Sequence, residues 1–136
     1  LEASSAASDV YKRQLLRPLV DAGVDVIHAS NRRFWEPEFE GSNLNLAGWT
    51  KKITGLPTIT VGSVGLESDF IGFYQGEDEV KSAPIDDLVK RMDDKEFDMV
   101  AVGRALLSDP EWVNKVKEGR YDEVIPFSKK HAENYY

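Results

Sequence analysis

The chain has 136 residues, a formal net charge of -7 and a sequence pI near 4.8. This length allows one domain or part of a larger one, and the acidity argues against nucleic acid and anionic membranes, which bind clustered Lys and Arg. With no cysteine and only two histidines, far apart, we expect no disulfide and no metal site. No apolar run approaches the ~20 residues that span a bilayer, so a cytoplasmic location is expected.

Residues 1–14 read LEASSAASDVYKRQ, a small and polar stretch without an apolar period. We interpret this stretch as lying outside the fold, either as sequence foreign to the protein or as a natural disordered extension. The fold is therefore expected in residues 15–136.

Three short apolar runs, each preceded by a helical pattern, predict an α/β fold with a parallel sheet. They are GVDVIHAS (23–30), LPTITVGSVG (56–65) and FDMVAVGRAL (97–106). In the first, Val24, Val26 and Ile27 are expected in a strand, after a helix that ends at Gly23. The third is almost continuously apolar, which is typical of strands buried on both faces.

The helical segments have recognisable ends. Residues 44–54 are expected to form a helix that stops at Gly55, and Pro84 is expected at the first position of the next helix. Spacing predicts that this helix turns one apolar face inward, made of Ile85, Leu88, Val89 and Met92. Ser108 or Asp109 is expected to cap a helix that runs through Trp112 to Gly119. The tail 121–136 is expected to form one more short helix.

Two long segments, 31–43 and 66–83, follow the ends of the first two strands, where parallel α/β folds build their sites. The first contains Phe34 and Trp35 beside Arg32 and Arg33. These residues are expected either to form a wall of a substrate or nicotinamide site, or to pack the loop onto the rim of the sheet. The acidic stretch 67–79 is interpreted as a solvated loop in preference to a mobile lid.

The pattern that carries chemistry joins Gly62, Ser63, Val64 and Gly65 after the second strand with Gly103-Arg104 after the third. Backbone N–H groups of glycine-rich turns donate to phosphate oxygens, a short helix starting near Gly103 would add its dipole, and Arg104 adds a permanent charge. Each glycine alone is better explained as a tight turn. Together with the arginine they predict a phosphate site.

The same residues resemble a known family. TITVGSVG followed by FDMVAVGRALLSDPEWVNKVKEG is similar to the last two strands and final helix of Old Yellow Enzyme flavoproteins, and NRRFWEPEFEGSNLNLAGW resembles the segment after strand six in one bacterial branch. The resemblance implies strands six to eight of a (β/α)8 TIM barrel that binds FMN and is reduced by NADH or NADPH. It implies hydride transfer to an enone-type small-molecule acceptor. The FMN-binding residues would be Gly62, Ser63, Val64, Gly103 and Arg104.

The family's catalytic residues come from earlier strands, so none can be assigned in this chain, and His28 is interpreted as a packed histidine of the barrel interior. Since a complete barrel needs about 250 residues, we expect a fragment that is inactive alone and aggregates or needs a partner, with a homo-oligomer as an open possibility.

Two alternative functions stay open. A non-flavin phosphate-binding barrel enzyme would need carboxylates at the strand C-termini, whereas Asp25 and Asp98 fall at strand starts. A small α/β binding domain would need a first βα unit within residues 1–14.

Overall fold

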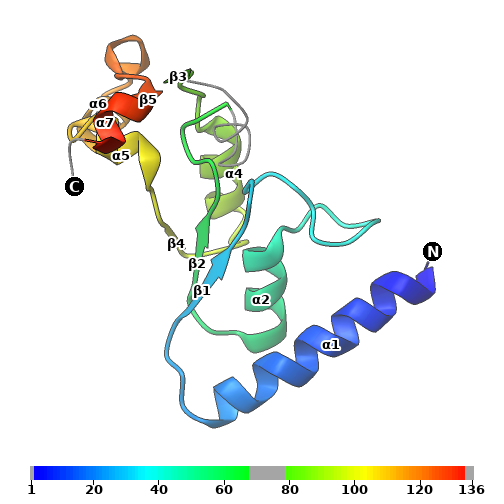
Figure 1. The fold of residues 1–136 in the computed structure, drawn as a ribbon. Helices are drawn as coiled ribbons and strands as arrows, with labels where there is room; N and C mark the ends of the chain where they lie inside the picture. Colours follow the sequence, from blue (N-terminus) through cyan, green and yellow to red (C-terminus); the bar gives the residue numbers. More distant parts are fainter. Residues whose placement is uncertain (1, 68–78, 134–136) are drawn as a thin grey trace.

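The computed structural model describes residues 2–67 and 79–133, which form a three-stranded and a two-stranded sheet with their helices (Figure 1). The elements are α1 (Glu2–Asp21), β1 (Ile27–Ser30), α2 (Leu46–Thr54), β2 (Thr58–Val61), β3 (Glu79–Val80), α4 (Asp86–Asp93), β4 (Met99–Val100), α5 (Arg104–Ser108), α6 (Trp112–Lys117), η1 (Tyr121–Glu123), β5 (Phe127–Ser128) and α7 (Lys129–Glu133).

The larger sheet confirms the predicted α/β class. Its strands are parallel in the order β1-β2-β4, with Ile27 opposite Thr58 and Ile59 opposite Met99. Helix α2 lies between β1 and β2 along the chain, and α4 lies between β2 and β4. Since parallel strands need such crossovers, the βα order of the sequence leads directly to this topology. Three strands do not close a barrel, so the barrel stays a prediction.

The expectation that the strands are buried on both faces is wrong for these residues. Thr58 and Thr60 are fully buried on the face that α2 covers, whereas Met99 on the other face is 40% exposed. His28, expected to be packed, is exposed on that same open face. The reason is that, in the part of the chain described, no second layer covers this side. β1 also begins at Ile27 rather than at Val24.

Helix α1 starts at Glu2 and therefore runs through the boundary expected at residue 14. Its second half contacts the body of the fold: Leu16 is buried, and the Lys12 ammonium pairs with Glu38 and lies 4.6 Å from the centre of the Phe39 ring. The interpretation of residues 1–14 as foreign sequence or a natural extension stays a prediction.

The ends of α2 follow local rules, and those of α4 do not. Gly55 ends α2 with a left-handed φ of 70°, as predicted. Helix α4 begins at Asp86, not at Pro84, and Val89 is 45% exposed instead of facing the core. Ahead of the helix, the Ala83 N–H donates to the carbonyl of Gly65 over 2.9 Å, which ties this segment to the turn after β2.

The C-terminal region differs from the single helix expected. It forms η1, β5 and α7, and β5 pairs antiparallel with β3. The short helix expected near Gly103 is present as α5. Ahead of α6, the Asp109 carboxylate accepts the backbone N–H of Glu111 at 3.1 Å, whereas Ser108 lies 2.8 Å from Nδ1 of His131. The N-cap residue of α6 is Glu111, without a side-chain cap hydrogen bond, so neither the Ser108 capping box nor the Asp109 cap is found. Asp109 instead closes a local turn just before the helix.

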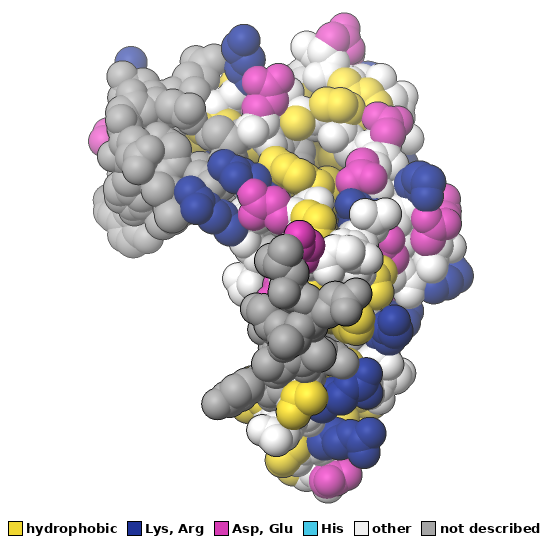
Figure 2. Space-filling model, turned by 90° about the vertical axis from the view of Figure 1, so that its right-hand side faces the viewer, with side chains coloured by type: hydrophobic (Ala, Val, Ile, Leu, Met, Phe, Trp, Pro, Cys, Tyr) yellow, Lys and Arg dark blue, Asp and Glu magenta, His cyan; other side chains and the backbone are white. Residues whose placement is uncertain are grey.

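The apolar core lies around the loops that follow β2 and β4. Its most buried members include Leu66, Phe97, Trp112 and Phe127. Because these side chains come from loops as well as from helices, the strand-end loops are anchored rather than free on the surface. On the face shown in Figure 2, acidic and basic side chains are interspersed and form no single large patch. None of the helices described has the length and hydropathy needed to cross a membrane.

Candidate functional site

A cavity of about 210 Å³ lies at the C-terminal ends of the three parallel strands. The five residues expected to bind FMN line it, although they come from two loops about forty positions apart, whereas Gly65 of the predicted phosphate pattern lines a neighbouring cavity instead. The complete lining is Asn31, Arg32, Val61, Gly62, Ser63, Val64, Leu66, Ala101, Gly103 and Arg104. The fold therefore brings the two predicted turns together into one site.

Two cationic side chains line this cavity. Arg32 and Arg104 are the charged residues among the described part of its lining, in which there is no Asp or Glu. Nη2 of Arg104 is 3.4 Å from Oγ of Ser63, whose hydroxyl in turn donates to the carbonyl of Arg32 over 3.2 Å. In a chain of net charge -7, two guanidinium groups at one cavity create a local positive field that attracts anions.

The turn after β2 lines the same cavity and has backbone N–H groups without a partner among the described residues. Ser63 has a left-handed φ of 51°, and its carbonyl accepts the N–H of Leu66 at 3.1 Å, which closes the turn. Within the two described ranges, no hydrogen bond uses the N–H of Ser63 or of Val64. Such consecutive N–H groups in a turn form an anion-binding concavity.

The three glycines around the cavity have different roles. A Cβ atom at Gly62, where φ is 139°, would lie 2.6 Å from the carbonyl oxygen of Asn31, and one at Gly65 would lie 2.7 Å from the Trp112 ring. These two glycines thus permit close packing of the protein with itself. Gly103 has no such neighbour within 4 Å, so its space opens outward and is compatible with a ligand.

Asn31 and Arg32 belong to the site and were absent from the sequence prediction of the phosphate turn. Asn31 is the first residue after β1, the position that Gly62 holds after β2, and this equivalence was the available signal. The Oδ1 atom of Asn31 is buried and has no hydrogen-bond partner in the structure described.

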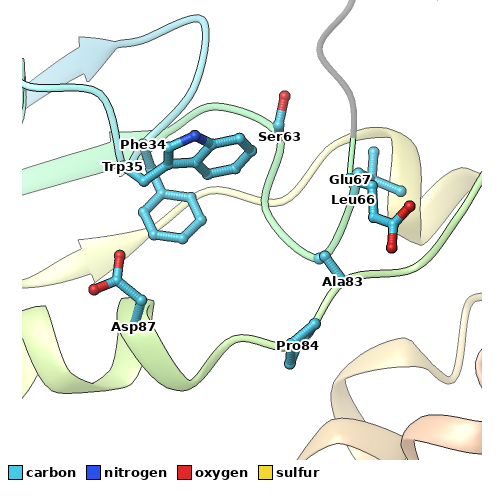
Figure 3. A pocket seen from close by; sticks show the side chains of 9 residues that line it. Phe34, Trp35, Ser63, Leu66, Glu67, Ala83, Pro84 and Asp87 are labelled. Carbon is cyan, nitrogen blue, oxygen red and sulfur yellow. The ribbon is translucent and has the colours of Figure 1, made fainter.

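A second cavity of about 260 Å³ adjoins the first and shares Ser63 and Leu66 with it (Figure 3). Its lining is Phe34, Trp35, Ser63, Gly65, Leu66, Glu67, Ala83, Pro84 and Asp87. Packing of the loop is confirmed for Phe34, whereas a substrate or nicotinamide site at this aromatic pair stays a prediction. Phe34 is only 4% exposed and packs in the core, yet both rings border this cavity and meet edge to face with centroids 5.1 Å apart. Of the acidic stretch 67–79, residues 68–78 lie outside the described residues.

Two aspartates away from the cavities stabilise the framework. Asp98, directly before β4, accepts Nζ of Lys51 at 2.7 Å and the N–H of Thr58 at 2.9 Å, and these bonds lower the pKa of its carboxyl. Asp109 is 1% exposed; burial acts to raise its pKa, but hydrogen bonds from Lys115 and from the N–H of Ile125 outweigh this and lower it. Both carboxylates hold structure together at a distance from the candidate site.

Comparison with known proteins finds similarity to an oxidase. The chain is 35% identical over 120 residues to a protein described as NADH oxidase from Thermoanaerobacter brockii. The aligned part covers 82% of this chain but 16% of the relative, so the chain spans about a sixth of that protein's length. No family model matches the chain. Over most of its length, the chain is therefore similar to one segment of an oxidoreductase.

Proposed function

We propose that this chain forms the phosphate-binding end of the FMN site in a flavin-dependent oxidoreductase. The observation that carries the proposal is the meeting of Arg32, Arg104 and the N–H groups of Ser63 and Val64 at one cavity, at the C-terminal ends of parallel strands. This is where α/β folds place their phosphate groups.

The residues present fit a phosphate monoester. Its charge meets two guanidinium groups, which bind phosphate oxygens through paired N–H donors. Its remaining oxygens have the turn N–H groups of Ser63 and Val64 as donors. A volume of about 210 Å³ is below the 300–1,000 Å³ of sites that enclose whole ligands, so the cavity suits the phosphate end and leaves the rest of FMN outside it.

The redox assignment rests on similarity. The relative is described as an NADH oxidase, and the motifs resemble those of Old Yellow Enzyme flavoproteins. When bound, FMN supplies hydride transfer, and the protein supplies binding and orientation. NADH or NADPH would be the reductant and an enone-type molecule the acceptor. These activities belong to a longer protein, because the chain corresponds to about a sixth of the relative.

The open face of the sheet supports the partial-barrel assignment. Ile59, Val61 and Met99 on this face are half-buried or exposed, and apolar side chains of that size are normally covered. In a closed barrel, further strands would bury these side chains in the interior. A self-sufficient α/β binding domain fits this exposed face less well.

A non-flavin sugar-phosphate enzyme would use the same phosphate cavity. Such chemistry needs a carboxylate or another acid-base group at the strand ends. Since no Asp or Glu of the described residues lines this cavity, the arrangement favours anion binding over proton transfer.

The test compares FMN with riboflavin, which lacks the phosphate. Replacing Arg104 with Ala removes a charge-assisted contact of about 1.5–3 kcal/mol, so the affinity for FMN should fall roughly 10- to 150-fold. The affinity for riboflavin should not change. Arg17→Ala, at an exposed position on α1, is the matched control, and circular dichroism checks that each variant is folded. Equal FMN affinity in Arg104→Ala and the unmodified chain would remove this residue from the site.

A further inference from the structure

The second cavity has the properties of a built binding site. Its floor is held by backbone contacts: the Glu67 N–H donates to the carbonyl of Lys81 at 3.0 Å, and Leu66 forms a bridge with Ser82. Since these contacts and the Ala83–Gly65 hydrogen bond fix the loops on either side, the space does not depend on loose side chains. Pre-formed cavities of this kind are the usual sites of small ligands.

The walls suit a flat ring. Figure 3 shows the rings of Phe34 and Trp35 on one side of the space, with Leu66 and Pro84 across from them. Trp35 is partly buried against the core, which limits the movement of its indole. Aromatic and proline faces about a narrow apolar space favour a planar heterocycle over a branched aliphatic group.

The polar groups of this cavity have the opposite sign from those of its neighbour. Glu67 and Asp87 border it, and none of the described residues in its lining is basic. Carboxylates accept hydrogen bonds from amino, amide or hydroxyl groups and repel phosphate. At about 260 Å³ the space is too small for a whole dinucleotide and suits one ring system.

We infer that this cavity binds the heterocyclic base of a nucleotide, next to the phosphate cavity that begins at the shared residues Ser63 and Leu66. The base stacks on Trp35, and its N–H donors face Asp87 or Glu67. Which nucleotide supplies this base rests on the proposed function. If FMN occupies the neighbouring site, the base is the adenine or the nicotinamide of the reductant, NADH or NADPH.

The experiment titrates the chain with adenosine, with nicotinamide riboside and with ribose, and follows the Trp35 indole and the Asp87 amide by NMR. None of these probes carries a phosphate, so the result does not depend on FMN binding. At least one of the two nucleosides should shift both NMR signals, and ribose should shift neither. The nucleoside that binds shows whether the cavity takes the adenine or the nicotinamide of the reductant.

Variants at Trp35 complete the test. Trp35→Leu should weaken nucleoside binding roughly 5- to 150-fold, as expected for loss of base stacking, while Trp35→Tyr retains most of it. Trp49→Leu, at a tryptophan outside both cavities, should have no effect. Loss of nucleoside binding in both Trp35→Leu and Trp49→Leu would overturn the proposal, as would shifts caused equally by ribose or by neither nucleoside. FMN affinity measured on the same samples shows separately whether the proposed function fails.

Discussion

Asp109 is the residue whose replacement should most clearly change the stability of this fold. Its carboxylate is almost completely buried and accepts three hydrogen bonds: from Nζ of Lys115 at 2.8 Å, from the N–H of Ile125 at 3.0 Å and from the N–H of Glu111 at 3.1 Å. Asp109→Asn keeps the shape but removes the charge that pairs with Lys115 and, in either orientation of the amide, places its N–H₂ opposite at least one of these three donors. Breaking a buried pair in this way costs about 3–5 kcal/mol in the free energy of unfolding.

Equilibrium unfolding in urea, followed by the fluorescence of the buried Trp112 at low protein concentration, measures this cost. Asp94→Asn is the control, because its pair with Lys90 is exposed to solvent and should contribute far less to the free energy of unfolding. If Asp109→Asn lowers the free energy of unfolding no more than Asp94→Asn does, then the buried hydrogen bonds of Asp109 do not stabilise the fold.

The pH dependence of the same unfolding experiment has a definite sign. The folded state lowers the pKa of Asp109 below its unfolded value of about 3.9. The carboxylate therefore contributes its full stabilisation above that value and loses it as the pH falls through the folded pKa. The difference between the unmodified chain and Asp109→Asn should consequently be largest near neutral pH and shrink in acid. A difference that is constant from pH 7 to pH 2 would contradict the assignment.

Two further substitutions test the loops that build the cavities. Gly62→Ala should lower the free energy of unfolding by on the order of 2 kcal/mol, because the new Cβ would meet the Asn31 carbonyl. Gly55 also has a positive φ but has open space around it, so Gly55→Ala should lower the free energy of unfolding less in the same urea assay. Asn45→Ala should lower the free energy of unfolding by about 3 kcal/mol, because it removes a helix cap and leaves buried hydrogen-bonding partners unsatisfied. Its control, Asn114→Ala, lies at an exposed position and should lower it by under about 0.5 kcal/mol. Equal losses within either pair would show that burial and close contact do not decide the effect.

The sequence by itself determined the order of strands and helices and the turns that end the strands. The helix end at Gly55 and the short helix after Gly103 follow from rules that act over a few residues, and those predictions are confirmed. The positions of Ser63 and Arg104 at strand ends follow for the same reason, because parallel strands end at one edge of a sheet. Local chemistry was sufficient to select them.

Only the tertiary structure decided which distant segments contact one another and line the same cavity. Asn45 caps α2 and also donates to the carbonyl of Phe34 at 2.8 Å and to Thr60 at 3.1 Å, which joins three segments through one buried amide. Asn31 and Arg32 line the 210 Å³ cavity because Gly62 lets their loop approach. His28 is exposed because its face of the sheet has no covering layer in the described residues. Such outcomes depend on contacts between residues far apart in the chain, and no local pattern contains that information.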